Sequence, residues 1–511
     1  MKKKDFILNL SAQLAVLLSN LIINFILTPY VVNKLGEAAY GFIGLINNFV
    51  SYITVVTVAL NTLAGRYITL SYHKKDIKRS EEYFASVFYA NIFLSFIVIL
   101  SSVVLIFNAT NWLKVPNGLE KDVQLTIFLS SINTIISLIT VVFGIAAFIK
   151  NKLYLNSISQ MLGALGRVIV IVIAFFLFRA HIWYYALAAI VSSVIILFIQ
   201  RRITRKECPD LKVNKKNFSV SRIIEIAKNG IWISVESLNK ILQTGLDLLI
   251  ANIFINPYAS GILSIAKTVP NVLVQLTTTI ASVFSPNLAK LYATDKKKEL
   301  ISEFKYTTKV LSVLMIVPLI GFMTFGEKFY FLWLHDRSAE DIKLIQILSF
   351  LTVFPLLVNA YVEGLYYANT LTNRIKGSVL LTLGFSLASI ITEIILLYTT
   401  KFEPLYIIAG TSSVYMSLRY FIVTPLYCAH ILNVPYSTFY PSLFKSLFTS
   451  LLIYALFYFV NSRTSANNWF SFIVICGICA LVGYIIVVIV LLNKEERSKL
   501  KQVVQTKIKR K

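Results

Sequence analysis

The residues best placed for chemistry are charged side chains inside two long apolar stretches. Residues 228–252 carry Glu236, Lys240 and Asp247 at steps of four and seven, and Lys267 lies in the next apolar stretch. This spacing places the first three side chains on one face of a helix. A charge within lipid is costly unless it is paired or hydrated, so such residues usually face a cavity. The pattern predicts a hydrated cavity with cationic walls, although a structural ion pair between Glu236 and Lys240 explains the same spacing.

Three arginines also interrupt apolar stretches. Arg167 and Arg419 lie near the middle of their stretches, and Arg66 lies about one turn from the end of its own. A guanidinium group suits a diphosphate, because arginine binds phosphate through two parallel hydrogen bonds. The structural alternatives are that Arg167 and Arg419 pair with Glu363, Glu393 or a carbonyl at a helix end, and that Arg66 extends toward the lipid headgroups. The sequence leaves both interpretations open.

Intramembrane carboxylates are candidates for energy coupling. Asp247, Glu363 and Glu393 lie inside apolar stretches, where a carboxylate can take up a proton or bind a cation during transport. We therefore expect coupling to H⁺ or Na⁺, unless these groups are salt-bridge partners. The sequence has no GxxxxGK[ST] phosphate loop, which argues against ATP hydrolysis. It also has no metal-ligand spacing, so neither a cofactor, a metal site nor a catalytic residue is predicted.

The elements that position these residues are predicted membrane-spanning helices. Hydrophobic residues make up 57% of the 511 positions and charged residues only 14%. So few charges cannot cover a soluble protein, whereas lipid accepts apolar side chains on every outer face. A span needs roughly 20 mainly apolar residues. The predicted fold is therefore an all-α integral membrane protein with about fourteen spans, at residues 6–32, 41–70, 83–107, 123–149, 157–178, 183–200, 228–252, 259–290, 306–326, 342–368, 377–398, 405–428, 442–460 and 469–492.

The positive charge follows the loops between these stretches. Lysine and arginine concentrate in alternate loops, among them 201–228 and 293–299, and in the tail 494–511. Cytoplasmic loops carry this excess, so both termini are predicted to be cytoplasmic. A net charge of +25 would also fit nucleic-acid binding, but such proteins gather their charge on one surface. We therefore exclude nucleic acid and expect the basic loop 201–228 to contact anionic membrane lipids.

An internal repeat divides the chain. Residues 37–45 (EAAYGFIGL) align with 257–265 (PYASGILSI), which places Gly41 over Gly261 at an offset of 220 residues. Basic loops follow both segments in the same register. Parallel repeats are typical of transporters, with the substrate path between them. The predicted organisation is two pseudo-symmetric six-helix bundles and two added helices: bundle 1–200, cytoplasmic loop 201–227, bundle 228–430, helices 431–492 and basic tail 493–511.

The same offset pairs the charges of the second repeat with amides in the first. Asn20 corresponds to Lys240 and Asn47 to Lys267, while Asn24 lies one turn after Asn20. Amides hydrogen-bond sugar hydroxyls, and ammonium groups neutralise phosphate. The amides of the first repeat and the lysines of the second repeat together therefore predict a cavity for a phosphorylated saccharide.

The segment 27–45 (LTPYVVNKLGEAAYGFIGL), with its Leu-Gly-x-x-x-Tyr-Gly motif, resembles the start of polysaccharide transport proteins. These belong to the superfamily that also holds multidrug and toxin extrusion exporters and the lipid II flippase. The span number and the basic central loop extend the resemblance over nearly the whole chain. The resemblance implies a flippase in the bacterial cytoplasmic membrane. Its implied substrates are undecaprenyl-diphosphate-linked oligosaccharide repeat units for O-antigen, capsule or teichoic acid, moved by alternating access alongside polysaccharide polymerase machinery.

Two other functions remain open. One is a cation-coupled exporter of the multidrug and toxin extrusion type, but such exporters typically have twelve spans and acidic cavities. The other is a membrane polysaccharide polymerase or ligase. Such an enzyme needs a sizeable outer loop for its catalytic residues, and the predicted outer loops at 108–122 and 327–341 are short.

Overall fold

The computed structural model describes residues 3–116, 118–150, 152–244, 246–334, 337–372, 374–493 and 496–497, all of them helical or in short connections, without a β-strand. The α-helices are α1 (Lys3–Leu35), α2 (Glu37–His73), α3 (Ile77–Trp112), α4 (Glu120–Phe143), α5 (Ile145–Ile149), α6 (Leu153–Leu177), α7 (Trp183–Glu207), α8 (Val220–Thr244), α9 (Leu246–Ile250), α10 (Pro257–Ser282), α11 (Ser285–Ala293), α12 (Lys297–Trp333), α13 (Ala339–Val362), α14 (Tyr367–Leu371), α15 (Ile375–Thr399), α16 (Pro404–Leu418), α17 (Thr424–Ile431), α18 (Tyr440–Arg463) and α19 (Trp469–Leu491). Five short 3₁₀ or π turns connect some of them: η1 (Lys215–Asn217), η2 (Ala251–Ile255), η3 (Glu363–Tyr366), η4 (Arg419–Val423) and η5 (Tyr436–Thr438).

Lipid dictates this helical structure. An apolar chain segment in a bilayer has no water to bond its backbone, so each segment must satisfy its own N–H and C=O groups as a helix. Eleven helices within the described residues are long and apolar enough to cross a membrane. The predicted all-α membrane fold is therefore confirmed. Helices also occupy the described residues of the other three predicted ranges, 41–70, 228–252 and 405–428, but the number of fourteen spans stays a prediction.

The internal repeat is visible in the helix boundaries. Helices α2 and α3 start at Glu37 and Ile77, and α10 and α12 start at Pro257 and Lys297, 220 residues later in both cases. The turn before α3 contains the hydrogen bond from Lys75 N to Tyr72 O, and the turn before α12 contains its equivalent from Asp295 N to Tyr292 O. Both donor residues adopt the left-handed conformation, with φ of 62° and 53°. The repeat therefore extends to individual backbone hydrogen bonds.

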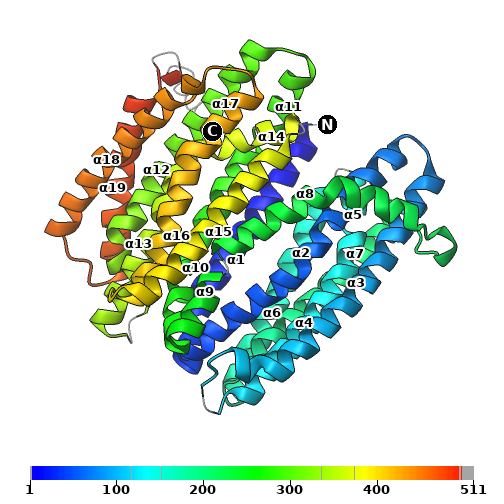
Figure 1. The fold of residues 1–511 in the computed structure, drawn as a ribbon, viewed down its shortest axis with the longest axis horizontal. Helices are drawn as coiled ribbons and strands as arrows, with labels where there is room; N and C mark the ends of the chain where they lie inside the picture. Colours follow the sequence, from blue (N-terminus) through cyan, green and yellow to red (C-terminus); the bar gives the residue numbers. More distant parts are fainter. Residues whose placement is uncertain are drawn as a thin grey trace. The chain divides into compact units, whose positions relative to one another are not determined.

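The chain packs into two compact units, residues 1–264 (unit 1) and 265–511 (unit 2) (Figure 1). In unit 1, α4 and α6 both pack against α7, and α2 runs along α8. Close backbone approach marks the crossing of α2 with the start of α10. A Cβ atom on Gly41 would lie 2.7 Å from Gly261 N, and one on Gly261 would lie 2.2 Å from Glu37 O. Two repeat-related glycines thus contact each other, because small residues let helices touch in a membrane.

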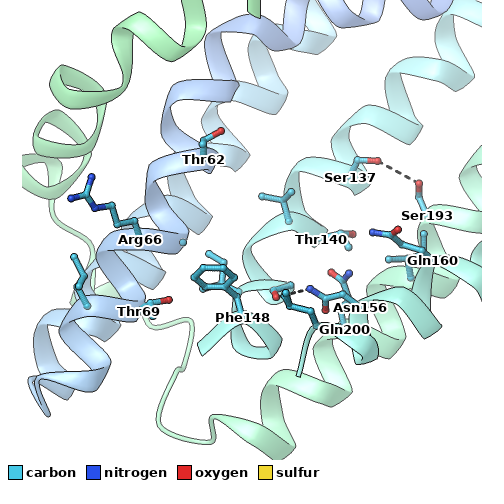
Figure 2. A pocket seen from close by; sticks show the side chains of 17 residues that line it. Thr62, Arg66, Thr69, Ser137, Thr140, Phe148, Asn156, Gln160, Ser193 and Gln200 are labelled. Atoms are coloured by element: carbon cyan, nitrogen blue, oxygen red, sulfur yellow. Dashed lines mark hydrogen bonds between the residues drawn. The ribbon is translucent and has the colours of Figure 1, made fainter. Parts of the chain in front are cut away.

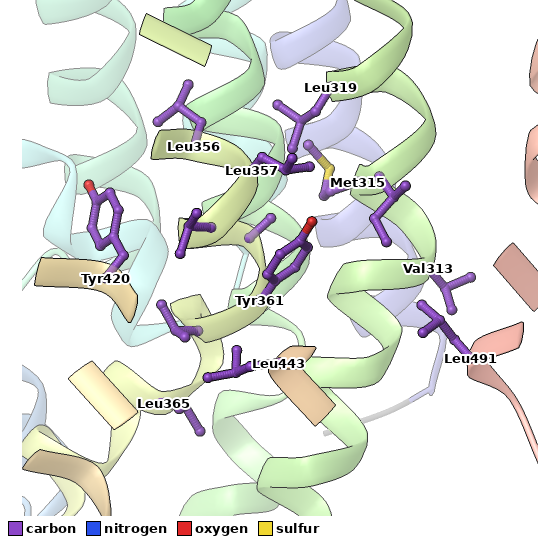
Figure 3. Close-up of a cluster of buried hydrophobic side chains, with 14 of the residues drawn as sticks. Val313, Met315, Leu319, Leu356, Leu357, Tyr361, Leu365, Tyr420, Leu443 and Leu491 are labelled. Carbon is purple, nitrogen blue, oxygen red and sulfur yellow. The ribbon is translucent and has the colours of Figure 1, made fainter. Parts of the chain in front are cut away.

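The interior of unit 2 is filled with large apolar side chains (Figure 3). Helices α12 and α13 form its centre, and α16, α18 and α19 pack around them. Met315, Leu319, Leu357, Tyr361 and Leu443 are among the buried residues of this cluster. The Tyr361 hydroxyl shares a hydrogen bond with Ser450. A buried phenol needs such a partner, since an unpaired hydroxyl in lipid is costly.

Candidate functional site

A cavity of about 750 Å³ lies inside unit 1, between α2, α4, α5, α6 and α7 (Figure 2). Its polar lining is formed by one arginine, three amides and hydroxyl groups: Arg66, Asn156, Gln160, Gln200, Thr62, Thr69, Ser137, Thr140 and Ser193. The described residues that line the cavity include no carboxylate side chain. The cavity therefore combines a single cation with uncharged hydrogen-bonding groups.

A break in the helix positions two of the amides. Helix α4 ends at Phe143 and α5 begins at Ile145, so the carbonyls around Gly144 need other donors. Asn156 Nδ2 donates to Gly144 O at 3.0 Å, and Thr204 Oγ1 donates to Phe143 O at 2.7 Å. A Cβ atom on Gly144 would lie 3.3 Å from Gln200 Oε1. Glycine at this break therefore lets the amide of Gln200 approach the backbone.

Three oxygens in the cavity wall have no hydrogen-bond partner although they are buried: Thr69 Oγ1, Asn156 Oδ1 and Gln200 Oε1. An unsatisfied buried oxygen typically costs about 1–3 kcal/mol. A ligand that donates hydrogen bonds would recover this free energy. The wall is thus built to accept hydrogen bonds from a bound molecule.

The cationic group and the amide groups of the cavity come from different helices. Arg66 is exposed and comes from α2, whereas Asn156 and Gln200 come from α6 and α7, with Phe148 between them in the view of Figure 2. Leu70, Val141, Leu153 and Ile196 complete the apolar wall alongside Phe148. This arrangement can hold an amphipathic molecule with an anionic group near α2.

The structure places other predicted cavity residues elsewhere. Asn20 on α1, Asn47 on α2 and Glu236 on α8 are exposed, and the cavity lining does not include them. The side chains of Asn24 and Lys240 lie outside the part that the structure describes. A substrate role for these five residues stays a prediction.

The remaining cations have distinct surroundings. Lys267 on α10 is buried, with 8% of its surface exposed. The Arg167 guanidinium lies 4.2 Å from the centre of the Tyr185 ring, and its buried Nε has no hydrogen-bond partner. A guanidinium stacked on a phenol ring gains cation–π attraction and keeps its N–H groups free for an anion. Of the nine predicted substrate residues, Arg66 is the one found in the cavity lining.

A second polar cluster lies in unit 2, where two helices are interrupted. Glu363 begins the 3₁₀ turn η3, and Arg419 begins the π turn η4. Asn359 Nδ2 donates to Glu363 Oε2 at 2.9 Å, while the Arg419 guanidinium lies 5.5 Å from the Tyr366 ring and 5.1 Å from the Tyr420 ring. Single π turns often mark functional sites. The two predicted residues therefore lie in a common region of irregular backbone.

The other two predicted acids are deeply buried. Asp247 on α9 is 4% exposed, and Glu393 on α15 is 1% exposed. A buried carboxylate is costly unless a hydrogen-bonding or charged partner stabilises it. Their surroundings agree with coupling and with a structural role alike.

Sequence reasoning missed Asn156, Gln160 and Gln200. The first two lie four residues apart and so share a helix face, which was the available signal. Uncharged amides recur in most of the predicted spans, however, and their cost in lipid is lower than that of a charge. Only the helix packing shows which amides meet.

Two solved structures share the fold of this chain. A solved structure titled lipid II flippase MurJ in an inward closed conformation matches 94% of this chain and 98% of its own, with a TM-score of 0.63 and 12% identity. An inward-facing MATE family transporter of the MOP superfamily matches 84% of this chain and 99% of its own, with a TM-score of 0.60 and 14% identity. At these identities the likeness establishes the fold.

Sequence relatives are more specific. An uncharacterized membrane protein, EpsK of Bacillus subtilis (strain 168), is 26% identical over 494 residues, which cover 96% of this chain and 97% of that protein. The family model described as polysaccharide biosynthesis protein matches residues 4–292. This multi-pass membrane protein, with the fold of MurJ and the MATE transporters, belongs to the polysaccharide biosynthesis protein family.

Proposed function

We propose that this protein is a flippase for undecaprenyl-diphosphate-linked oligosaccharide repeat units. It moves them from the cytoplasmic to the outer leaflet of the bacterial cytoplasmic membrane by alternating access, with both termini in the cytoplasm. The product supplies polysaccharide polymerase machinery that assembles O-antigen, capsule or teichoic acid. The protein acts as a transporter and not as an enzyme.

The observation that carries this proposal is the cavity in unit 1. Its single cation, Arg66, suits phosphate, and its amides and hydroxyls suit sugar hydroxyls. Apolar side chains beside them suit a prenyl chain. Family membership supports the same substrate class. The substrate path outside this cavity is proposed to be lined by the other predicted polar residues: Lys267, Glu236, Asn20, Asn47, Asn24 and Lys240.

Coupling is proposed to use H⁺ or Na⁺ at Asp247, Glu363 and Glu393. The clustering of Glu363 with Arg419 at two interrupted helices favours Glu363, since irregular turns can rearrange at lower cost than continuous helices. Neutral variants at each position, tested in vesicles with an imposed proton or sodium gradient, identify the coupling group as the one whose variant loses gradient-driven transport.

The test of the function is a flipping measurement in proteoliposomes. The purified chain is reconstituted with a fluorescent polyprenyl-diphosphate-linked disaccharide, and dithionite quenching reports the fraction in the outer leaflet. We expect Arg66→Ala to slow flipping by at least about tenfold, and Arg66→Lys to retain part of the rate. Arg201→Ala, an exposed arginine near the end of α7, is the matched control and should leave the rate unchanged.

A cation-coupled exporter is the second candidate, favoured by the fold shared with MATE transporters. The cationic cavity argues against it, because a cationic drug prefers acidic walls. Export of a cationic dye from the same vesicles, without flipping of the lipid-linked disaccharide, would replace the proposed function by this one.

A further inference from the structure

The unit 1 cavity has hydrogen-bond acceptors and a hydrogen-bond donor at different positions in its wall, so a ligand fits it in one orientation. Asn156 donates through Nδ2 to Gly144 O at 3.0 Å. That bond identifies the other atom, Oδ1, as an acceptor, and this oxygen is buried without a partner. A phosphate cannot satisfy it, because ionised phosphate oxygens only accept hydrogen bonds.

Gln200 is the second acceptor of this wall. Its side chain is 6% exposed, lines the cavity, and leaves Oε1 without a partner. The terminal torsion of glutamine is soft, so a small rotation turns this oxygen toward a bound donor. Sugar hydroxyls donate readily and also accept, which makes them the matching ligand groups.

Arg66 has the opposite chemistry. A guanidinium has five N–H donors and no acceptor, so it donates hydrogen bonds to phosphate and cannot accept one from a hydroxyl group. Its exposed position on α2 contrasts with the buried position of Gln200 on α7. The donor-only group on α2 and the two unsatisfied amide oxygens on α6 and α7 thus lie on different helices around one cavity (Figure 2). The third unsatisfied oxygen, the Thr69 hydroxyl on α2, can donate to a phosphate as well as accept.

We propose that the cavity binds its ligand in one orientation, with the sugar hydroxyls at Asn156 and Gln200 and the phosphate at Arg66. The inference rests on the proposed function and specifies which residues bind the sugar and which bind the phosphate. The ligand class is a phosphate-linked saccharide whose first sugar enters the wall between α6 and α7. A phospholipid with a polyol headgroup offers similar groups and is distinguished by the experiment.

The experiment measures binding, without transport, to the full chain in phosphatidylcholine nanodiscs. Three probes are titrated: farnesyl-diphosphate-linked N-acetylglucosamine, farnesyl diphosphate, and an uncharged farnesyl glucoside. We expect Gln200→Leu and Asn156→Leu to weaken the glucoside by roughly tenfold and leave farnesyl diphosphate unchanged. Arg66→Gln should do the reverse. Gln275→Leu, an exposed amide on α10, is the matched control.

A measurement on the unaltered chain guards against variants that misfold. Methylation of the hydroxyls of the farnesyl glucoside removes the donors and keeps the acceptors, so this probe should bind at least about fivefold more weakly. Equal binding of the methylated probe overturns the inference, as does equal weakening of farnesyl diphosphate and of the farnesyl glucoside by Gln200→Leu. The inference is also overturned if phosphatidylglycerol competes for the site as strongly as the saccharide probe binds it, because the site then binds any polyol phosphate.

The outcomes separate this inference from the proposed function. Probe discrimination as expected, together with absent flipping in proteoliposomes, keeps the binding orientation and removes the flippase. Flipping that persists while the probes show no discrimination keeps the flippase and removes the orientation.

Discussion

The two packing units are filled in different ways. In unit 2, 67% of the most apolar window of α12 and 72% of that of α13 are buried. In unit 1 the highest such share is 44%, for the span Glu120–Ile149, which lines part of the cavity. Dense packing has low compressibility and resists change, whereas the buried oxygens without partners in the unit 1 cavity stay available to a ligand. We infer that unit 2 contributes stability and unit 1 contributes recognition.

The largest expected effect is the loss of a core side chain in unit 2. Phe457 on α18 is 1% exposed, and its ring lies 5.8 Å from that of Phe325. Phe457→Ala should lower the free energy of unfolding by about 3–5 kcal/mol, because the cavity left behind cannot collapse fully. Thermal unfolding in detergent micelles measures the change. Phe448→Ala, 59% exposed on the same helix, is the control and should change stability by less than about 0.5 kcal/mol. Equal losses would show that the centre of unit 2 is not specially rigid.

Removal of polar groups should have opposite effects in the two units. Gln200→Leu deletes a buried oxygen without a partner, so stability should stay the same or rise by about 1 kcal/mol while saccharide binding falls. Ser349 in unit 2 shares a hydrogen bond of 2.7 Å with Tyr330 and donates to Ala266 O at 2.8 Å. Ser349→Ala should therefore cost about 1 kcal/mol. Calorimetric scans of both variants check the pair, and a stability loss for Gln200→Leu would contradict the assignment of the cavity.

The sequence predicted the fold better than the site, for a physical reason. Apolar stretches and the offset that aligns Gly41 with Gly261 are local features of the sequence. They predict helices from residues 41 and 259, and in the structure these helices begin slightly earlier, at Glu37 and Pro257. Lipid enforces a helix wherever such a stretch occurs. The same reasoning cannot say which helices meet.

The site depends on that packing. The search for charges found Arg66, but the amides that share its cavity come from α6 and α7 and carry no charge. Conversely, Asn20 and Asn47 are among the amides predicted to line the cavity, yet they are exposed and the cavity lining does not include them. The faces of α6 and α7 that meet are set by small residues. A Cβ atom on Gly163 would lie 2.7 Å from Ile196 Cγ1, and this contact could not be read from hydropathy.

Smaller changes in stability are expected where ion pairs join helices within a unit. In unit 1, Glu225 on α8 accepts from Tyr83 at 2.8 Å and from Arg222 at 3.3 Å, and lies 3.5 Å from Arg79. Glu225→Gln should lower the free energy of unfolding by about 1 kcal/mol, because three partners lose one carboxylate. High salt should reduce the difference. Glu299→Gln, which removes an exposed pair with Lys296, is the control with no measurable change expected. Equal effects would indicate that the network adds nothing beyond a surface pair.

The smallest effect is expected at the ion pair between Glu496 and Lys309 in unit 2, where Lys309 Nζ lies 2.6 Å from Glu496 Oε1. Burial alone would raise the pKa of the Glu496 carboxyl, but the hydrogen bonds from Lys309 and from Asn493 N outweigh it and hold this pKa below its ordinary value. A lowered folded-state pKa contributes stability above the unfolded pKa, and this contribution is lost as the pH falls through the folded value. The melting-temperature difference between the unaltered protein and Glu496→Gln should thus correspond to at most about 1 kcal/mol at pH 7, and should vanish as the pH falls from about 5 to 3. A difference that persists at pH 3 would assign the effect to packing of the side chain and not to its charge. The contrast with Glu225 would then reflect burial in unit 2, not the number of charged partners.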